Sequence, residues 1–290
     1  MISQNLIEVF VFLLGVCIGS FLNCAVYRLE QENSFLKGRS YCPNCRHNLN
    51  WLDLVPVFSF LFLRGKCRYC KEKISRQYPV VEISTGIIFL LIFNFLNNTA
   101  NLAGAKFVVY LNLAFLFYVA SVLVIIFIYD FKHYLIPDKV LFPAIIITFI
   151  YRLFDSGNLI RLFHSSEKAA LFEIWDLGFG IFAPLLNYFY AVAIGFGFFL
   201  FIFLISKGRW MGFGDVKLAI LMGLVLGFPS ILVALFLAFF FGAIIGVGLM
   251  AFNKKDLKSE IPFGPFLIFG TFAAMLWGGQ LIQWYLNLII

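Results

Sequence analysis

The chain has 290 residues, of which 62% are hydrophobic and only 13% charged, and its formal net charge is +7. It is too apolar for a water-soluble globular protein, and 39 phenylalanines point instead to a protein that lies in a lipid bilayer. Composition therefore excludes a soluble enzyme and a soluble binding domain.

Several apolar segments are long enough to cross a membrane, which takes about 20 helical residues each. We therefore predict an all-α polytopic membrane protein with about eight transmembrane helices. The second, fourth and sixth segments are short or are interrupted by polar residues, so their ends are the least well defined. The predicted segments are 6–27, 80–96, 107–129, 140–154, 183–206, 216–228, 230–252 and 264–288.

The first apolar segment has no cationic stretch before it and no small-residue cleavage site after it. We expect it to be a retained membrane anchor rather than a signal peptide. Cys17 and Cys24 are seven positions apart in this segment and therefore share one face of the helix. We expect both to be buried as small packing residues.

The basic residues indicate the orientation of the chain. If the N-terminus is outside, the cytoplasmic loops are 28–79, 130–139, 207–217 and 253–262, and these hold 18 of the 22 Lys and Arg residues. Such an asymmetry follows the positive-inside rule. The positive charge thus reflects topology, and we expect a lipid bilayer but no nucleic acid as a partner.

The only long polar loop, 30–79, contains four of the six cysteines. They form two CxxC pairs separated by 21 residues, and two such pairs can supply the four thiolates of a structural zinc site. A cytoplasmic loop is reducing, which disfavours the alternative of two disulfides. A loop this small would depend on metal for its folding energy. We therefore predict a small cytoplasmic zinc-binding domain whose ligands are Cys42, Cys45, Cys67 and Cys70.

Two aspartates lie where long apolar segments meet short charged loops. Asp130 is the first residue of the stretch 130–138, and Asp215 is the last residue of Gly212-Phe213-Gly214-Asp215. An ionisable group at a membrane boundary is expensive to keep there and indicates function by default. If the helices bring them together, one carboxylate can deprotonate a water while the other, protonated, polarises a peptide carbonyl. Asp130 ends a helix and Asp215 begins one, so the helix dipoles favour Asp215 as the ionised base.

Residues around the aspartates have structural as well as functional interpretations. Asp138 follows Pro137 and is expected to cap a helix N-terminus. Gly212 and Gly214 are interpreted as active-site loop residues that permit close backbone approach and unusual φ/ψ angles before Asp215. Lys132, His133 and Lys217 are explained by the positive-inside pattern.

Three further polar residues lie at membrane depth or just inside it, namely Asn23, Arg28 and Glu82. They either pair with one another or line a cofactor site, and the sequence leaves both alternatives open. His47, two residues after Cys45, is expected at the surface rather than as a metal ligand.

With these motifs in order, the chain resembles the bacterial type IV prepilin peptidases. The resemblance begins with Gly15-Val16-Cys17-Ile18-Gly19-Ser20-Phe21-Leu22-Asn23, runs through both CxxC pairs and ends at Pro262-Phe263-Gly264-Pro265. As an ordered set the motifs are highly specific, whereas GxGD alone is weak. They occupy residues 15–23, 27–28, 42–47, 51–57, 63–70, 74–79, 130–138, 212–217 and 262–265.

The resemblance implies a bifunctional enzyme of the bacterial inner membrane. It would cleave the basic leader from type IV prepilins and type II secretion pseudopilins at the cytoplasmic face, and then methylate the new N-terminal amine with S-adenosylmethionine. Asp130 and Asp215 would be the catalytic aspartates of a GxGD protease, and the four cysteines the metal ligands. The methyl-donor site is not visible from any motif, since no glycine-rich methyltransferase loop occurs.

The resulting division of the chain has three parts. Residues 1–29 form the first transmembrane helix, 30–79 the zinc loop associated with methyl transfer, and 80–290 the aspartyl peptidase core. The connection over 155–182 is longer than the resemblance predicts; it carries Asp155, Glu167, Glu173 and Asp176 and is expected outside, away from the chemistry.

Three other classes of protein were considered. A presenilin-like or signal-peptide-peptidase-like protease would share Tyr129-Asp130 and GxGD, but it would lack the CxxC pairs and carry a Pro-Ala-Leu motif, which this chain does not contain. The alternative of a membrane scaffold with a zinc loop gives no reason for Asp130 and Asp215. A transporter would place ionisable residues near the bilayer midplane, not at its edge.

Overall fold

The computed structural model describes residues 2–31, 38–100, 106–155, 173–251 and 262–289. In these ranges the protein is helical, and the only β pairing is two isolated antiparallel bridges. The all-α prediction is therefore confirmed. The chain divides into two compact units, Met1–Ile128 and Tyr129–Ile290, which are described separately below.

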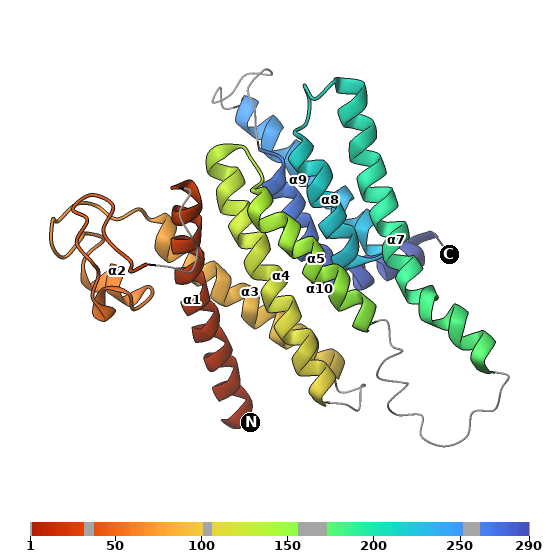
Figure 1. Cartoon of the computed structure of the whole chain (residues 1–290), viewed down its shortest axis with the longest axis horizontal. Helices are drawn as coiled ribbons and strands as arrows, with labels where there is room; N and C mark the ends of the chain where they lie inside the picture. The colour runs from red at the N-terminus through yellow and green to blue at the C-terminus, as the bar shows by residue number, and fades with distance from the viewer. Residues whose placement is uncertain (1, 32–37, 101–105, 156–172, 252–261, 290) are drawn as a thin grey trace. The chain divides into compact units, whose positions relative to one another are not determined.

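In the first unit, α1 (Ile2–Glu30) packs lengthwise against α3 (Gln77–Ala100) (Figure 1). Glycines make this close approach possible: a Cβ added to Gly15 would lie 2.8 Å from the Cα of Gly86, and one added to Gly19 would lie 2.8 Å from the Cα of Glu82. Small residues are the usual means of packing two membrane helices closely. Between α1 and α3, the described residues 38–76 contain the 3₁₀ turn η1 (Trp51–Asp53) and the short helix α2 (Phe58–Phe62).

Helix α4 (Lys106–His133) begins in the first unit and ends in the second. Its Phe117 stacks on Phe89 of α3 with ring centroids 4.0 Å apart. The last turn of α4, beyond Ile128, belongs to the second unit. This last turn carries Asp130.

The second unit is built around α8 (Phe213–Leu226), which packs against α7 (Glu173–Ser206), α5 (Asp138–Asp155) and α10 (Gly264–Ile289) (Figure 1). Helix α9 (Ser230–Ala251) lies along α10. Nine of the 14 residues of α8 are buried, and a Cβ added to Gly223 would lie 2.7 Å from the backbone of Val192. The short, all-round apolar α8 is thus the core of this unit, as expected for a helix without a polar face.

Each of the eight predicted segments overlaps a helix, but not all of these helices, as described, are long and apolar enough to span a bilayer. Six helices are long and apolar enough to span a bilayer, namely α1, α3, α4, α7, α9 and α10. Helix α8 has only 14 residues, and α5 carries four charged residues within its 18. A count of eight spans therefore remains a prediction.

Two local expectations were wrong. Cys17 is exposed on the surface of α1 rather than buried, and Cys24 is half-buried. The 155–182 connection is shorter than predicted, because α7 already begins at Glu173. Residues 156–172, including Glu167, lie outside the described residues.

Arg152 binds the C-terminal end of α8. It is one of the four Lys and Arg residues outside the predicted cytoplasmic loops. Its Nε donates to the carbonyl of Leu224 at 3.0 Å, its Nη2 donates to that of Val225 at 2.6 Å, and the guanidinium lies 4.4 Å from the ring centre of Tyr188. The last carbonyls of a helix have no partner within that helix. Arg152 therefore stabilises α8 at the end opposite Asp215.

We predict that Arg152→Met lowers the free energy of unfolding by about 2 kcal/mol, the usual contribution of a charged hydrogen bond. Thermal unfolding of the purified protein in detergent measures the effect. Arg209→Met is the matched control, because Arg209 is exposed. Equal melting temperatures for the two variants would contradict the role given to Arg152.

Candidate catalytic and metal sites

The four cysteines of the loop between α1 and α3 come together at one point. Their sulfur atoms all lie within 4.8 Å of one another, and the Sγ atoms of Cys42 and Cys70 are 3.9 Å apart. In a tetrahedral site with Zn–S bonds of about 2.3 Å, neighbouring sulfurs are roughly 3.8 Å apart. The arrangement therefore fits a four-cysteine zinc site, as the sequence predicted.

The two CxxC turns have the same backbone structure, repeated after 25 positions. In the first turn the N–H of Cys42 donates to the carbonyl of His47, and Arg46 has a φ of 55°. In the second turn the N–H of Cys67 donates to the carbonyl of Glu72, and Lys71 has a φ of 60°. An isolated bridge closes each turn, one joining Tyr41 to Asn48 and the other joining Lys66 to Lys73. Each turn is thus a complete knuckle that presents two thiols to one ion.

Hydrogen bonds around the sulfurs favour the thiolate form of Cys67. Burial alone would raise the pKa of the Cys67 thiol, but the backbone N–H groups of Cys70 and Tyr69 and the thiols of Cys70 and Cys42 lower that pKa to about 7. Metals bind the thiolate form. In the same cluster the contacts with neighbouring cysteines raise the pKa of Cys70 to about 11, against the effect of the Glu72 backbone, as expected when one thiol donates to another sulfur.

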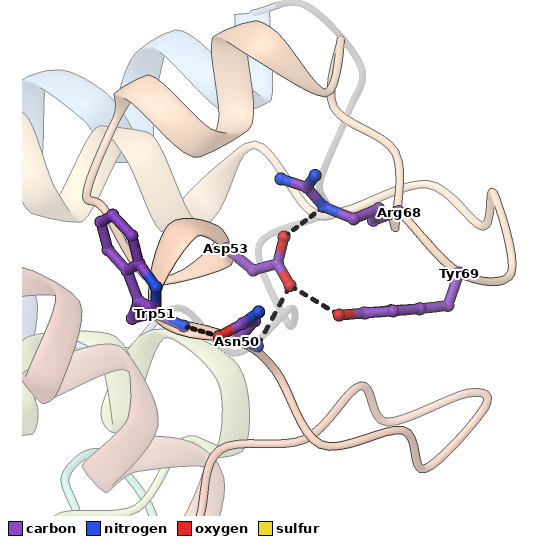
Figure 2. Close-up of polar contacts among 5 residues, drawn as sticks. All are labelled: Asn50, Trp51, Asp53, Arg68 and Tyr69. Carbon is purple, nitrogen blue, oxygen red and sulfur yellow. Dashed lines mark hydrogen bonds and ion pairs between the residues drawn. The ribbon is translucent and has the colours of Figure 1, made fainter.

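Asp53 joins the linker between the knuckles to the second knuckle (Figure 2). Its carboxylate accepts hydrogen bonds from Arg68 Nε at 2.7 Å, from the Tyr69 hydroxyl at 3.1 Å and from the backbone N–H of Asn50 at 3.1 Å. Burial acts to raise the pKa of Asp53, but these donors hold it below the usual value. The ring of His47 packs on that of Tyr69, with centroids 3.7 Å apart, so His47 is a packing residue and not part of the sulfur cluster.

The three polar residues of α1 and α3 each bind the backbone of the loop or its borders. Glu82 accepts from the N–H of Val57 at 2.7 Å, Asn23 donates to the carbonyl of Tyr78 at 3.1 Å, and Arg28 donates to that of Gly38 at 2.8 Å. Val57 has a φ of 61°, which is strained for a β-branched residue. These contacts are with backbone groups and not the mutual pairing offered by the sequence as one alternative; they give the three residues a structural role, and the alternative of a cofactor site stays a prediction.

In the second unit, Asp130 and Asp215 are both buried and close enough to interact electrostatically. Asp130 lies in the last turn of α4 and Asp215 in the first turn of α8. The sequence placed both at helix ends but could not show that the ends approach each other. The structure also brings the N-terminus of α10 to Asp130, where the N–H of Gly264 faces the carboxylate. Each aspartate therefore lies at a helix N-terminus, so the helix dipoles do not favour either one as the ionised base.

The chain between Asp130 and α5 reverses sharply. Tyr134, with a φ of 57°, donates its N–H to the carbonyl of Asp130 at 2.8 Å. The reversal brings Ile136 against the GxGD turn, where a Cβ added to Gly214 would lie 3.1 Å from the Ile136 Cβ. Gly214 thus packs closely against Ile136, its approach to a substrate stays a prediction, and the expected unusual φ/ψ is wrong for Gly212, whose φ and ψ are −71° and 149°. A non-glycine residue with positive φ beside a candidate site is a common place for backbone strain.

Lys217 forms an ion pair with Asp138, the first residue of α5. Its ammonium also lies 5.4 Å from the ring centre of Phe142 and 5.6 Å from that of Phe213. The positive-inside pattern predicted a charge here but not its partner. This pair joins α5 to α8 two residues from Asp215.

Sequence reasoning overlooked two features of these sites. The repeat of the knuckle at 25 positions is visible in the alignment of Cys42-Pro43-Asn44-Cys45 with Cys67-Arg68-Tyr69-Cys70, and it could have been found. The approach of Gly264 to Asp130 could not, because more than 130 residues separate them in the chain.

Comparisons with known proteins agree on one family. The family described as the bacterial peptidase A24 N-terminal domain matches residues 13–96, and the type IV leader peptidase family matches residues 117–247. The first match includes the four cysteines, and the second includes both aspartates. No solved structure matches the chain.

Curated relatives match over nearly their whole length and carry the name prepilin leader peptidase/N-methyltransferase. The protein of Bacillus subtilis is 30% identical over 279 residues, which are 96% of this chain and 98% of the relative. That of Aeromonas salmonicida is 27% identical, covering 97% and 94% of the two chains, and that of Pseudomonas aeruginosa is 27% identical, covering 95% and 92%.

The geometry of the cysteine cluster generates a prediction about metal. Protein purified without chelators should contain a single zinc ion per chain, and Cys67→Ser should remove it, because three thiolates hold zinc less tightly than four. Elemental analysis measures the metal, and limited proteolysis of the loop over 38–76 measures its order. Cys17→Ser is the control, since Cys17 lies outside the cluster. Metal-free protein with a protease-resistant loop would refute the zinc assignment.

Proposed function

Because the chain belongs to the type IV leader peptidase family, we propose that it cleaves the leader peptides of type IV prepilins and type II secretion pseudopilins and methylates the new N-termini. The single observation that best supports the hydrolytic half is the pair of buried carboxylates, Asp130 and Asp215, which separate helices bring close enough to interact electrostatically. A scaffold protein would have no need to bury two like charges together.

We assign Asp130 and Asp215 as the catalytic pair. One carboxylate accepts a proton from a water molecule as the water attacks the carbonyl carbon of the scissile peptide bond. The other, protonated, donates a hydrogen bond to the carbonyl oxygen and stabilises the charge that develops there. The tetrahedral intermediate then collapses, the C–N bond breaks, and the amine leaves with a proton delivered by the first carboxylic acid. Hydrolysis of the peptide bond by this route thus requires only two carboxyl groups and one water molecule.

Gly212 and Gly214 complete the proposed active-site loop. Gly214 allows the backbone to pack against Ile136, so that Asp215 enters α8 directly beside the end of α4. The ion pair between Lys217 and Asp138 holds the starts of α5 and α8 together. We infer that these residues position the pair and do not themselves react.

The orientation of the chain follows from its charges. With the N-terminus outside, the loops that hold 18 of the 22 Lys and Arg residues face the cytoplasm, in agreement with the positive-inside rule. Asp130, Asp215 and the cysteine loop then all lie at the cytoplasmic face of the inner membrane. A prepilin whose basic leader is cytoplasmic and whose next segment is apolar would present its cleavage point at this depth.

We assign the zinc loop a structural role, in methyl transfer or substrate presentation. Zinc held by Cys42, Cys45, Cys67 and Cys70 would have no open coordination position for a catalytic water, so it would fix the fold of the loop and not take part in hydrolysis. S-adenosylmethionine, when bound, supplies the methyl group. The described residues form no recognisable donor site, so no residue is assigned to it.

We predict that Asp130→Asn and Asp215→Asn each abolish leader cleavage while the protein still inserts and folds. Each change removes a general acid or base with little change of shape. Mass spectrometry of a synthetic prepilin incubated with purified enzyme measures cleavage, and the melting temperature measures folding. Glu72→Gln, an acid-to-amide change at an exposed position of the cysteine loop, is the control. Near-normal cleavage by either aspartate variant would refute the assignment.

A further prediction concerns the leader. The turns that carry Asp130 and Asp215 are not strongly acidic, so we expect anionic lipid to help recognise the basic leader, at about 1 kcal/mol per basic residue near the surface. Neutralising the leader should therefore slow cleavage more in vesicles with anionic lipid than in zwitterionic vesicles. An equal slowing of cleavage in both kinds of vesicle would show that the protein alone recognises the charge of the leader.

A further inference from the structure

The N-terminus of α10 approaches Asp130 so closely that only glycine fits. Gly264 is the first residue of α10 and is buried. A Cβ added to Gly264 would lie 2.5 Å from Asp130 Oδ2 and 3.1 Å from its Cγ, which is well inside the contact distance of a methyl group and an oxygen. The side chain of any other residue at this position would therefore displace the carboxylate.

The first turn of α10 leaves one backbone donor for Asp130. The first N–H groups of a helix have no partner within the helix. In α10, Pro265 has no N–H, and the N–H groups of Phe266 and Leu267 both donate to the carbonyl of Phe263, at 3.0 and 3.2 Å. The N–H of Gly264 remains, and it faces the Asp130 carboxylate.

One oxygen of Asp130 is left without a partner. Asp130 is only 5% exposed, and its Oδ2 accepts no hydrogen bond of regular geometry from the described residues. A buried polar atom without a partner costs free energy, and such atoms in native proteins mark catalytic or binding roles. Oδ2 is also the atom that a side chain at position 264 would strike.

Aromatic packing holds Gly264 in place. Phe263, the preceding residue, contacts Phe239 with ring centroids 4.9 Å apart, and it contacts Phe199 and Phe266 at 6.2 Å each. Phe199 is fully buried. These rings anchor the start of α10 to α7 and α9, so the backbone at Gly264 has little freedom to retreat from Asp130.

We propose that Gly264 is a positioning residue for the hydrolytic reaction. Its N–H orients the Asp130 carboxylate, and its missing side chain keeps Oδ2 clear for the water or the scissile carbonyl. This inference rests on the proposed peptidase function, because it gives Asp130 its catalytic geometry. It also explains the glycine in Pro262-Phe263-Gly264-Pro265 by a contact that no local pattern reveals.

The first experiment compares the kinetics of Gly264→Ala and Gly279→Ala. Gly279 lies in the same helix, and a Cβ there would meet nothing within 4 Å. Displacing a catalytic group by about 1 Å can cost about 100-fold in rate, so Gly264→Ala should lower kcat by about 100-fold while KM for the synthetic prepilin stays near that of the parent. Methyl transfer to a peptide that is already cleaved should be unchanged. Gly279→Ala should have the same kcat, the same KM and the same rate of methyl transfer as the parent. A parental kcat in Gly264→Ala, or a loss that appears only in KM, overturns the proposal.

The second experiment is a thermal double-mutant cycle, which needs no substrate. Gly264→Ala should lower the melting temperature in the parent and have no such effect in Asp130→Ala, because the atom that it strikes is then absent. If Gly264→Ala does not fold by itself, recovery of folding in the double variant supports the contact equally. The same penalty, or failure to fold, in both backgrounds overturns it. A parent that cleaves no prepilin would refute the proposed function, whereas an uncoupled cycle would refute only this inference.

Discussion

The burial of two carboxylates close enough to interact is the constraint on the second unit. Like charges at close range resist joint ionisation. The surrounding helices must therefore hold Asp130 and Asp215 together. Asp130 lies at the end of α4 and Asp215 at the start of α8, the N–H of Gly264 at the start of α10 faces Asp130, and α5 is tied to α8 by the ion pair of Asp138 and Lys217.

The position of α8 follows from the same requirement. A 14-residue helix with nine buried residues contributes little to the surface of the unit, but its first turn carries Asp215 into the interior. Gly223 permits α7 to pack closely, and Arg152 binds the carbonyls at the far end. Both ends of α8 therefore contact other helices. These contacts fix the rotation of α8 and hence the direction in which Asp215 points.

In the first unit, the described part of the cysteine loop contains two isolated bridges and two very short helices. Such a loop has too little apolar core to fold without help. Zinc at the four sulfurs would join the two knuckles, and Asp53 joins the second knuckle to the linker. Contacts of Arg28 with Gly38 and of Glu82 with Val57 then connect the loop to the closely packed pair of α1 and α3. Asn23 of α1 donates a hydrogen bond to the carbonyl of Tyr78 in α3.

Local patterns along the chain were sufficient to predict which segments are helical, which four cysteines cluster and which two aspartates form the candidate pair. These features depend on apolar runs and on short spacings, such as the two residues between the cysteines of each pair. The burial of Cys17 was overestimated, because an apolar run does not reveal which helix face packs. The connection before α7 was predicted too long, because the helix begins before its apolar span does. The contacts of Arg152 with α8, of Glu82 with Val57 and of Gly264 with Asp130 arise only when the helices pack. Each of these contacts joins residues far apart in sequence, and helix packing, not local propensity, sets their distances.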